Sequence, residues 1–349
     1  PSSEERRRQE SIRAKLAQAK ALEAAADYPQ AANLAQQALE EAEALEALPL
    51  IGEARYRLAS GLGRQGQFAE LRRNSLQAAR IAMAARDDDL LARALTRMII
   101  ASWVRADTED ALEWSQLAAA AIERLGGRND LEAIRRQFLC MLGYQSRQYE
   151  TAADHCRAAL EIDPGMPPQR RALVLNNLGN AQSGLGHLDA ALATYRESMA
   201  LDEQLYGREH PAYATTLGNI GNILGKRCEL IEAQAHHEQA LAIKERTEGP
   251  DNPNIVVQLL NVGLLLADRG LYPEGVPYLE RALRFEPDDP HLLADIQFHL
   301  ARALWGSGGD RQRALRLAGT ALEAFESLGE VYARETAEAT DWLAERRGS

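Results

Sequence analysis

Three features of the sequence have residue types that could do chemistry. His236, His237 and Glu238 are metal-ligand types, but adjacent helical residues point about 100° apart and rarely share one ion. Residues 61–66 read GLGRQG, which matches the glycine pattern of dinucleotide sites but lacks the strand that must precede it. The many carboxylates fall on solvated helix faces or in links. We therefore predict no catalytic residue, no metal site and no cofactor.

The most promising functional pattern is a ladder of asparagines. Asparagine both donates and accepts hydrogen bonds, so it can hold the backbone of a bound peptide or satisfy a neighbouring helix end. Residues three apart on a helix are neighbours on one flank. Both roles stay open for the members of the ladder, which are Asn177, Asn180, Asn219, Asn222 and Asn261.

The composition narrows the class of protein. The chain has 349 residues, of which 46% are hydrophobic and only 5% aromatic, with alanine and leucine dominant. Small alanines with leucines suit closely packed helices. A net charge of −11 opposes nucleic acid as a partner. We expect no membrane span, because no window of about 18 apolar residues occurs. The three cysteines form no even disulfide framework, so we expect a reducing, cytoplasmic setting.

The elements that would position these residues repeat along the chain. A shift of 42 residues carries Leu178-Gly179 onto Ile220-Gly221 and then onto Val262-Gly263. The anchor position near the start of the second half of each unit, usually alanine, recurs every 39 to 42 residues, at Ala31, Leu71, Ala111, Ala152, Ala191, Ala233, Gly275 and Ala314. We therefore predict eight units within residues 1–329, at 12–50, 51–90, 91–129, 130–168, 172–212, 213–254, 255–291 and 292–329.

Each unit is predicted to hold two antiparallel helices joined by a short turn. Apolar residues recur at helical spacing in the first half of a unit. Gly207 and Pro211, like Gly249 and Pro253, end one unit and begin the next, since glycine follows helix ends and proline begins helices. Residues 330–349 form one more, mostly polar segment, as expected of a capping helix.

This pattern resembles the tetratricopeptide repeat. The signature Trp-x2-Leu-Gly-x2-Tyr, Ala-x3-Phe appears as Leu175, Leu178-Gly179 and Gln182, then Ala191 and Tyr195. The resemblance implies an all-α fold, a right-handed superhelical solenoid of about eight helix-turn-helix repeats with a capping helix. It also implies that a concave groove, lined by the first helices, binds a protein or peptide, as in kinesin-light-chain-type arrays.

Residue sizes in the repeat have a physical reason. Gly179 and Ala191 let two helices approach closely, and Tyr195 fills the space around that contact. Cys140 and Cys156 fall at the positions of Gly179 and Tyr195 in an earlier unit. They are expected to lie close together as small buried apolar side chains, with a redox pair as the alternative.

Two further segments resemble the repeat regions of bacterial serine/threonine kinases, at residues 119–133 and 301–329. The chain lacks kinase motifs such as His-Arg-Asp and Asp-Phe-Gly. We predict a non-catalytic interaction module, which this second resemblance places as a docking region of a kinase polypeptide, with a stand-alone adaptor or an unrecognised enzyme as alternatives. Its oligomeric state is open. Besides the asparagines, the candidate groove residues are Lys20, Arg64, Trp103, Tyr144, Lys226, Arg302 and Trp305.

Overall fold

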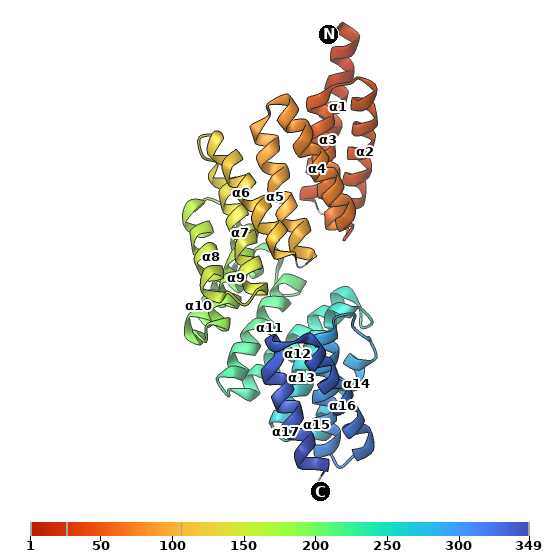
Figure 1. Ribbon diagram of the computed structural model, residues 1–349, viewed down its shortest axis with the longest axis vertical. Helices are drawn as coiled ribbons and strands as arrows, with labels where there is room; N and C mark the ends of the chain where they lie inside the picture. Colours follow the sequence, from red (N-terminus) through yellow and green to blue (C-terminus); the bar gives the residue numbers. More distant parts are fainter. Residues whose placement is uncertain (1, 26, 106, 348–349) are drawn as a thin grey trace. The chain divides into compact units, whose positions relative to one another are not determined.

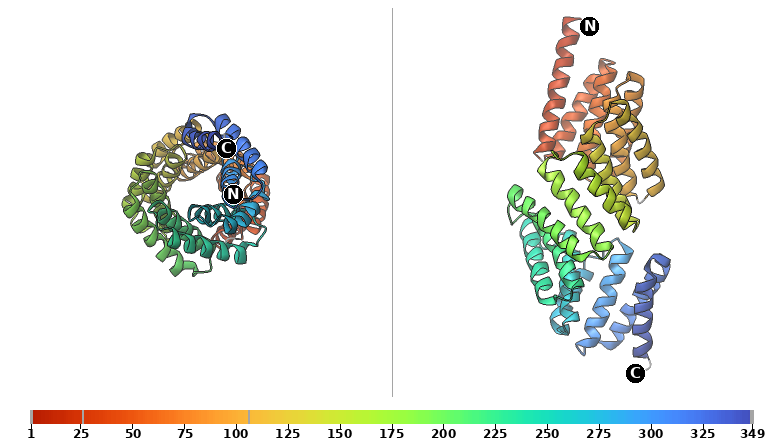
Figure 2. Two further views of the ribbon diagram at one scale, coloured as in Figure 1. Left: turned by 90° about the horizontal axis from the view of Figure 1, so that it is seen from below. Right: turned by 90° about the vertical axis from the view of Figure 1, so that its left-hand side faces the viewer.

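The computed structural model describes residues 2–25, 27–105 and 107–347. Every α-helix in these residues belongs to an antiparallel pair except the last (Figures 1 and 2). The chain divides into an N-terminal unit, Pro1–Pro167, and a C-terminal unit, Pro168–Ser349. The described residues hold α-helices and short 3-10 helices without a strand. The all-α fold of paired helices predicted from the sequence is therefore confirmed.

The N-terminal unit contains four helix pairs. Helix α1 begins at Ser3, whereas the first predicted repeat begins at residue 12. The helices are α1 (Ser3–Ala24), α2 (Tyr28–Ala44), α3 (Leu48–Arg64), α4 (Phe68–Ala85), α5 (Asp88–Val104), α6 (Thr108–Arg124), α7 (Asn129–Gln145) and α8 (Tyr149–Ile162).

The C-terminal unit contains four more pairs and a final helix. Gly348 and Ser349, which end the predicted capping segment, lie outside the described residues. The elements are α9 (Pro168–Gly184), α10 (Leu188–Tyr206), α11 (Pro211–Lys226), α12 (Leu230–Glu248), η1 (Pro253–Ile255), α13 (Val256–Asp268), α14 (Tyr272–Leu283), α15 (Pro290–Gly306), α16 (Arg311–Leu328), η2 (Glu330–Tyr332) and α17 (Ala333–Arg347).

Local sequence signals set the helix ends. Aspartates cap several first turns, as when Asp87 accepts the backbone N–H of Leu90 at 2.9 Å. Pro211 is the first residue of α11, where a missing N–H costs nothing. Gly207 ends α10 with φ of +82°, a left-handed backbone conformation that favours glycine.

The helices of a pair approach most closely where a small residue faces a large one. A Cβ at Gly179 would lie 2.6 Å from the ring of Tyr195, so no larger residue fits there without a shift. His237 stands opposite Gly221 in the same way, and the next pair repeats the arrangement with Gly263 and Leu279. The tight contact is therefore a property of the repeat, shared by three successive pairs.

In the fourth pair this position holds a covalent bond. Cys140 of α7 and Cys156 of α8, both fully buried, form a disulfide across a separation of 16 residues. The expectation of two separate apolar side chains is therefore wrong, because the two sulfur atoms are bonded. The cysteine count no longer argues for a reducing setting, because only Cys228 is a free thiol.

Candidate binding face

Successive first helices contact one another in each unit. Helix α3 contacts α1 and α5, and α5 contacts α7; in the C-terminal unit, α11 contacts α9 and α13, and α13 contacts α15. Within each unit, a second helix packs against the first helix that precedes it and against the next helix of the same unit where there is one. We call the exposed side of these first helices the first-helix face of each unit. All the predicted groove residues lie on first helices, at different degrees of exposure.

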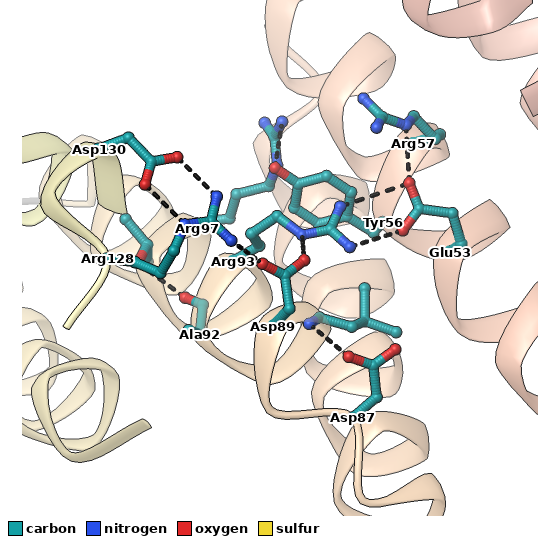
Figure 3. Close-up of polar contacts among 12 residues, drawn as sticks. Glu53, Tyr56, Arg57, Asp87, Asp89, Ala92, Arg93, Arg97, Arg128 and Asp130 are labelled. Carbon is teal, nitrogen blue, oxygen red and sulfur yellow. Dashed lines mark hydrogen bonds and ion pairs between the residues drawn. The ribbon is translucent and has the colours of Figure 1, made fainter. Parts of the chain in front are cut away.

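The N-terminal unit carries an aromatic side chain surrounded by arginines on this face. The guanidinium carbons of Arg93 and Arg97 lie 4.7 and 4.5 Å from the ring centre of Tyr56, and that of Arg57 lies at 5.5 Å. Figure 3 shows these side chains together on α3 and α5. Such cation–ring contacts stabilise closely placed arginines, most strongly where water is excluded.

Ion pairs continue from this cluster across three first helices. Glu53 accepts from Arg57 at 2.9 Å and from Arg93 at 2.8 Å (Figure 3). Arg93 also pairs with Asp89, which in turn pairs with Arg128 at the start of α7. The carboxylates raise the pKa of Arg93, so its charge is fixed. The row links α3, α5 and α7 through compensated charges.

Arg97 differs from its neighbours because it bonds only to hydroxyl groups. It donates to Ser60 Oγ at 2.7 Å and to Tyr56 Oη at 3.2 Å. Its Nε is buried without a hydrogen-bond partner, and no ion pair joins it to a carboxylate in the described part of the chain. Ser60 in turn donates to Glu23 at 3.0 Å. A half-buried guanidinium of this kind can donate hydrogen bonds to an anionic or carbonyl oxygen of a bound molecule.

The residues predicted for the groove in this unit lie on four different first helices. Lys20 and Arg64 are exposed, and Arg64 lies over the ring of Tyr28 at 5.9 Å. Trp103 is half-buried against a packed cluster, with Nε1 unpartnered. Tyr144 is 43% exposed and contacts Tyr149. Within the described residues, no hydrogen bond, ion pair or ring contact joins these four to one another.

Most asparagines of the ladder form hydrogen bonds to other side chains of the C-terminal unit. Asn219 donates to Asn176 at 3.2 Å, and Asn261 donates to Asn222 at the same distance. Asn180 accepts from the hydroxyl of Tyr195 at 2.6 Å. These bonds join neighbouring first helices or the two helices of one pair. Asn222 is exposed, whereas the buried Nδ2 of Asn177 has no partner.

The charged and aromatic candidates of the C-terminal unit are also engaged. Lys226 is exposed and donates to Ser183 Oγ at 2.8 Å. Arg302 pairs with Asp268 at 3.4 Å and with Glu338 of α17 at 3.6 Å.

Trp305 lies against α17, with its ring centre 5.8 Å from that of Trp342. The final helix thus packs over Trp305, a candidate groove residue. Trp305 lies against a core that includes Phe298 and Phe325.

Sequence reasoning missed Tyr56, Arg93, Arg97 and Asn176. A signal for the arginines exists: a shift of 40 residues places Arg93 on Glu53 and Arg97 on Arg57. This register indicates adjacent side chains on neighbouring first helices. Asn176 directly precedes the ladder but lacks an asparagine one repeat later, where Gly218 stands.

The remaining sequence motifs concern metal binding and membrane insertion. No group of three or more His, Cys, Asp or Glu side chains in the described residues is placed to hold a metal ion. His237 is buried beside Gln258, and His236 contacts the backbone of Glu232. None of the described helices is both long and apolar enough to cross a membrane.

The fold and the first-helix faces define an α-helical repeat protein. A family model for the tetratricopeptide repeat matches residues 170–246 and 216–285. Residues 170–285 of the C-terminal unit therefore match the tetratricopeptide repeat. A search of curated proteins found no significant match.

Solved structures of similar fold cover nearly the whole chain. A Rap protein complexed with Competence and Sporulation Factor is 17% identical, with a TM-score of 0.64, and the similarity covers 97% of this chain and 99% of that one. The apo form of the quorum sensor NprR from B. thuringiensis is 12% identical, with a TM-score of 0.67 and the same coverage. The apo form of RapI is 13% identical, with a TM-score of 0.67, covering 96% and 97%. At these identities the similarity shows the fold.

Proposed function

We propose that the chain is a non-catalytic module that binds a peptide or protein segment on the first-helix face. The observation that carries this proposal is Arg97, whose half-buried guanidinium bonds only to hydroxyls and lies against Tyr56. Arginine and tyrosine are the residue types that most often anchor protein interfaces. Exposed Asn222 and Lys226 offer polar contacts on the corresponding face of the other unit.

The similar structures support this proposal by analogy of fold. The Rap protein was crystallised with Competence and Sporulation Factor bound, and NprR is a quorum sensor. A chain that shares their fold over nearly its whole length has a comparable scaffold for a bound partner. Which molecule binds depends on the side chains, since one fold serves many functions.

Site-specific photo-crosslinking tests which surface binds. A crosslinking amino acid replaces Arg64 or Asn222, which are exposed on first helices, and Arg73 or Ile231, which are exposed on second helices. We expect partner segments from the source cells to attach at the first-helix positions. Equal attachment at Arg73 and Ile231 would contradict the proposal.

The identified segment then allows a quantitative test. Arg97→Gln should weaken its binding to the full chain about tenfold or more, because truncating an interface anchor costs at least about 1–2 kcal/mol. Arg73→Gln on α4 removes one arginine charge elsewhere and should leave the affinity unchanged. Equal effects of both variants would mean that general charge, rather than Arg97, attracts the segment.

A narrower proposal concerns the context of the chain. The resemblance of residues 119–133 and 301–329 to bacterial kinase repeat regions supports a cytoplasmic docking arm of a serine/threonine kinase polypeptide. A kinase domain encoded in the same reading frame would establish it, and its absence would favour a stand-alone adaptor. Stoichiometric ATP binding by this chain, measured by calorimetry, would instead favour an enzyme.

A further inference from the structure

A cavity of about 270 Å³ opens between α9, α10 and α11 of the C-terminal unit. Its size suits one side chain, because pockets for drug-sized ligands span about 300–1,000 Å³. Leu173 and Tyr206 contribute apolar walls and are 48% and 43% exposed. The polar side chains that line it include Asp202, Thr216 and Asn176.

The carboxylate of Asp202 is buried in this cavity without a cation. Asp202 is 5% exposed, and its Oδ2 accepts from the hydroxyl of Thr216 at 3.0 Å. Thr216 accepts in turn from Asn176 at 3.0 Å. No ion pair to Asp202 exists within the described residues, and burial raises its pKa. A buried carboxylate is costly without a paired charge.

His210 is the titratable neighbour of this carboxylate, and its ring is already placed. It stacks on Tyr206 with ring centres 4.3 Å apart, and its Nδ1 accepts the backbone N–H of Ala212 at 3.1 Å. No hydrogen bond or ion pair joins His210 to Asp202 within the described residues. Attraction to His210 offsets only part of the effect of burial on the pKa of Asp202.

Helix packing does not require an aspartate at this position. A shift of 42 residues carries Asp202 onto Lys244, in the second helix of the next pair. The same shift carries Thr216 onto Gln258 and Asn176 onto Gly218. The polar group of Asn176, Thr216 and Asp202, which spans α9, α10 and α11, is therefore not repeated one register further along the chain.

We propose that this cavity receives a lysine or arginine side chain of the bound segment, whose cationic group pairs with Asp202. The aliphatic stem would lie between Leu173 and Tyr206, as long basic side chains commonly do on apolar surface. Thr216 would keep the carboxylate oriented by its hydrogen bond. This inference rests on the proposed function, and it adds a chemical requirement for a basic residue in the partner.

The test uses small probes on the full chain. N-acetyl-arginine methylamide and N-acetyl-lysine methylamide carry the cation, and N-acetyl-citrulline methylamide is the neutral equivalent of the first. Methyl NMR signals of Leu173 and Thr215, both at the cavity, report occupancy. We expect saturable shifts with at least one cationic probe, and at least fivefold weaker binding of the citrulline probe.

Two variants and one control complete the experiment. Asp202→Asn keeps a hydrogen-bond acceptor for Thr216 and should weaken cation binding at least fivefold. Leu173→Trp should block the mouth of the cavity while leaving the carboxylate in place. Asp189→Asn removes a charge from the exposed surface of α10, the helix that carries Asp202, and should leave the binding of the probes unchanged.

The outcomes separate this inference from the proposed function. Equal binding of the citrulline probe, no shift with either cation, or full binding by both Asp202→Asn and Leu173→Trp would overturn the cation site. A shift with the arginine probe alone would identify a guanidinium site, and a shift with both would identify a general one. Crosslinking at Arg64 and Asn222 does not depend on Asp202, so its failure would instead refute the first-helix face.

Discussion

A leucine at residue 179 would collide with the ring of Tyr195, because even a Cβ there lies 2.6 Å from it. Gly179→Leu should therefore lower the free energy of unfolding by at least about 1–3 kcal/mol. Gln182→Leu, one turn further along α9, should be neutral or slightly stabilising. The side chain of Gln182 is buried and its Oε1 has no hydrogen-bond partner, so leucine removes an unmet polar group.

Urea unfolding of the two variants and the parent chain checks this pair. Each variant adds one leucine to the same helix, so the difference between them isolates the close approach of α9 and α10. If both variants lose the same stability, size at residue 179 is not what limits the contact.

At residue 237 the same repeat position becomes sensitive to pH. His237 is 1% exposed, and burial lowers its pKa to about 4, whereas an unfolded histidine titrates near 6.5. Between these values the unfolded chain binds a proton that the folded chain does not. Stability should therefore fall as pH drops from about 6.5 to about 4, by up to about 3 kcal/mol from this residue.

The variant His237→Leu removes that titration. Leucine should fit at this position, because Leu279 stands opposite Gly263 in the next pair. Free energies of unfolding at several pH values between 4 and 7 should decline less steeply for the variant than for the parent chain. Parallel curves would mean that His237 takes up its proton equally well in both states. His236→Leu, at the half-buried neighbouring histidine, is the matched control.

At the scale of elements, the disulfide joins α7 to α8 at the position where the pairs of the C-terminal unit place a glycine opposite a larger side chain. Cross-linking a loop of about 15 residues restricts the unfolded chain by up to about 3 kcal/mol. The double variant Cys140→Ala, Cys156→Ala should therefore have a lower free energy of unfolding than the oxidised chain, by no more than that value. It should also melt at a lower temperature.

Alkylation of the denatured chain checks the bond itself. Without a reductant, one alkyl group should be added, at Cys228, and three should be added after reduction. Three groups without reduction would show that Cys140 and Cys156 are free thiols. The melting temperature of the reduced chain should then equal that of the oxidised one.

For the whole molecule, much of the helix arrangement could be predicted from the repeat. Gly207 and Pro211 bound α10 and α11 as expected, because their backbone preferences act locally. The 42-residue register also placed Gly179 against Tyr195 and Cys140 against Cys156. It reports which positions face each other and how large they are, but not whether two sulfurs reach bonding geometry.

The site was less predictable because it depends on side chains that meet across helices. For Asn180 the sequence left open a peptide-binding or a structural role, and in the structure it accepts from Tyr195. Trp305 contacts α17, whose position does not follow from the repeat period. Tyr56 and Arg97 carry no motif, and their partnership appears only when α3 and α5 lie side by side.

The covalent link between α7 and α8 also has a mechanical consequence. If the chain is pulled from its ends, the segment between Cys140 and Cys156 stays enclosed by the bond, because tension passes through the sulfur atoms. The 16-residue separation corresponds to roughly 50–60 Å of extended chain. Fully stretched, the oxidised molecule should be shorter than the reduced one by about that length, so its reach under load depends on a single bond.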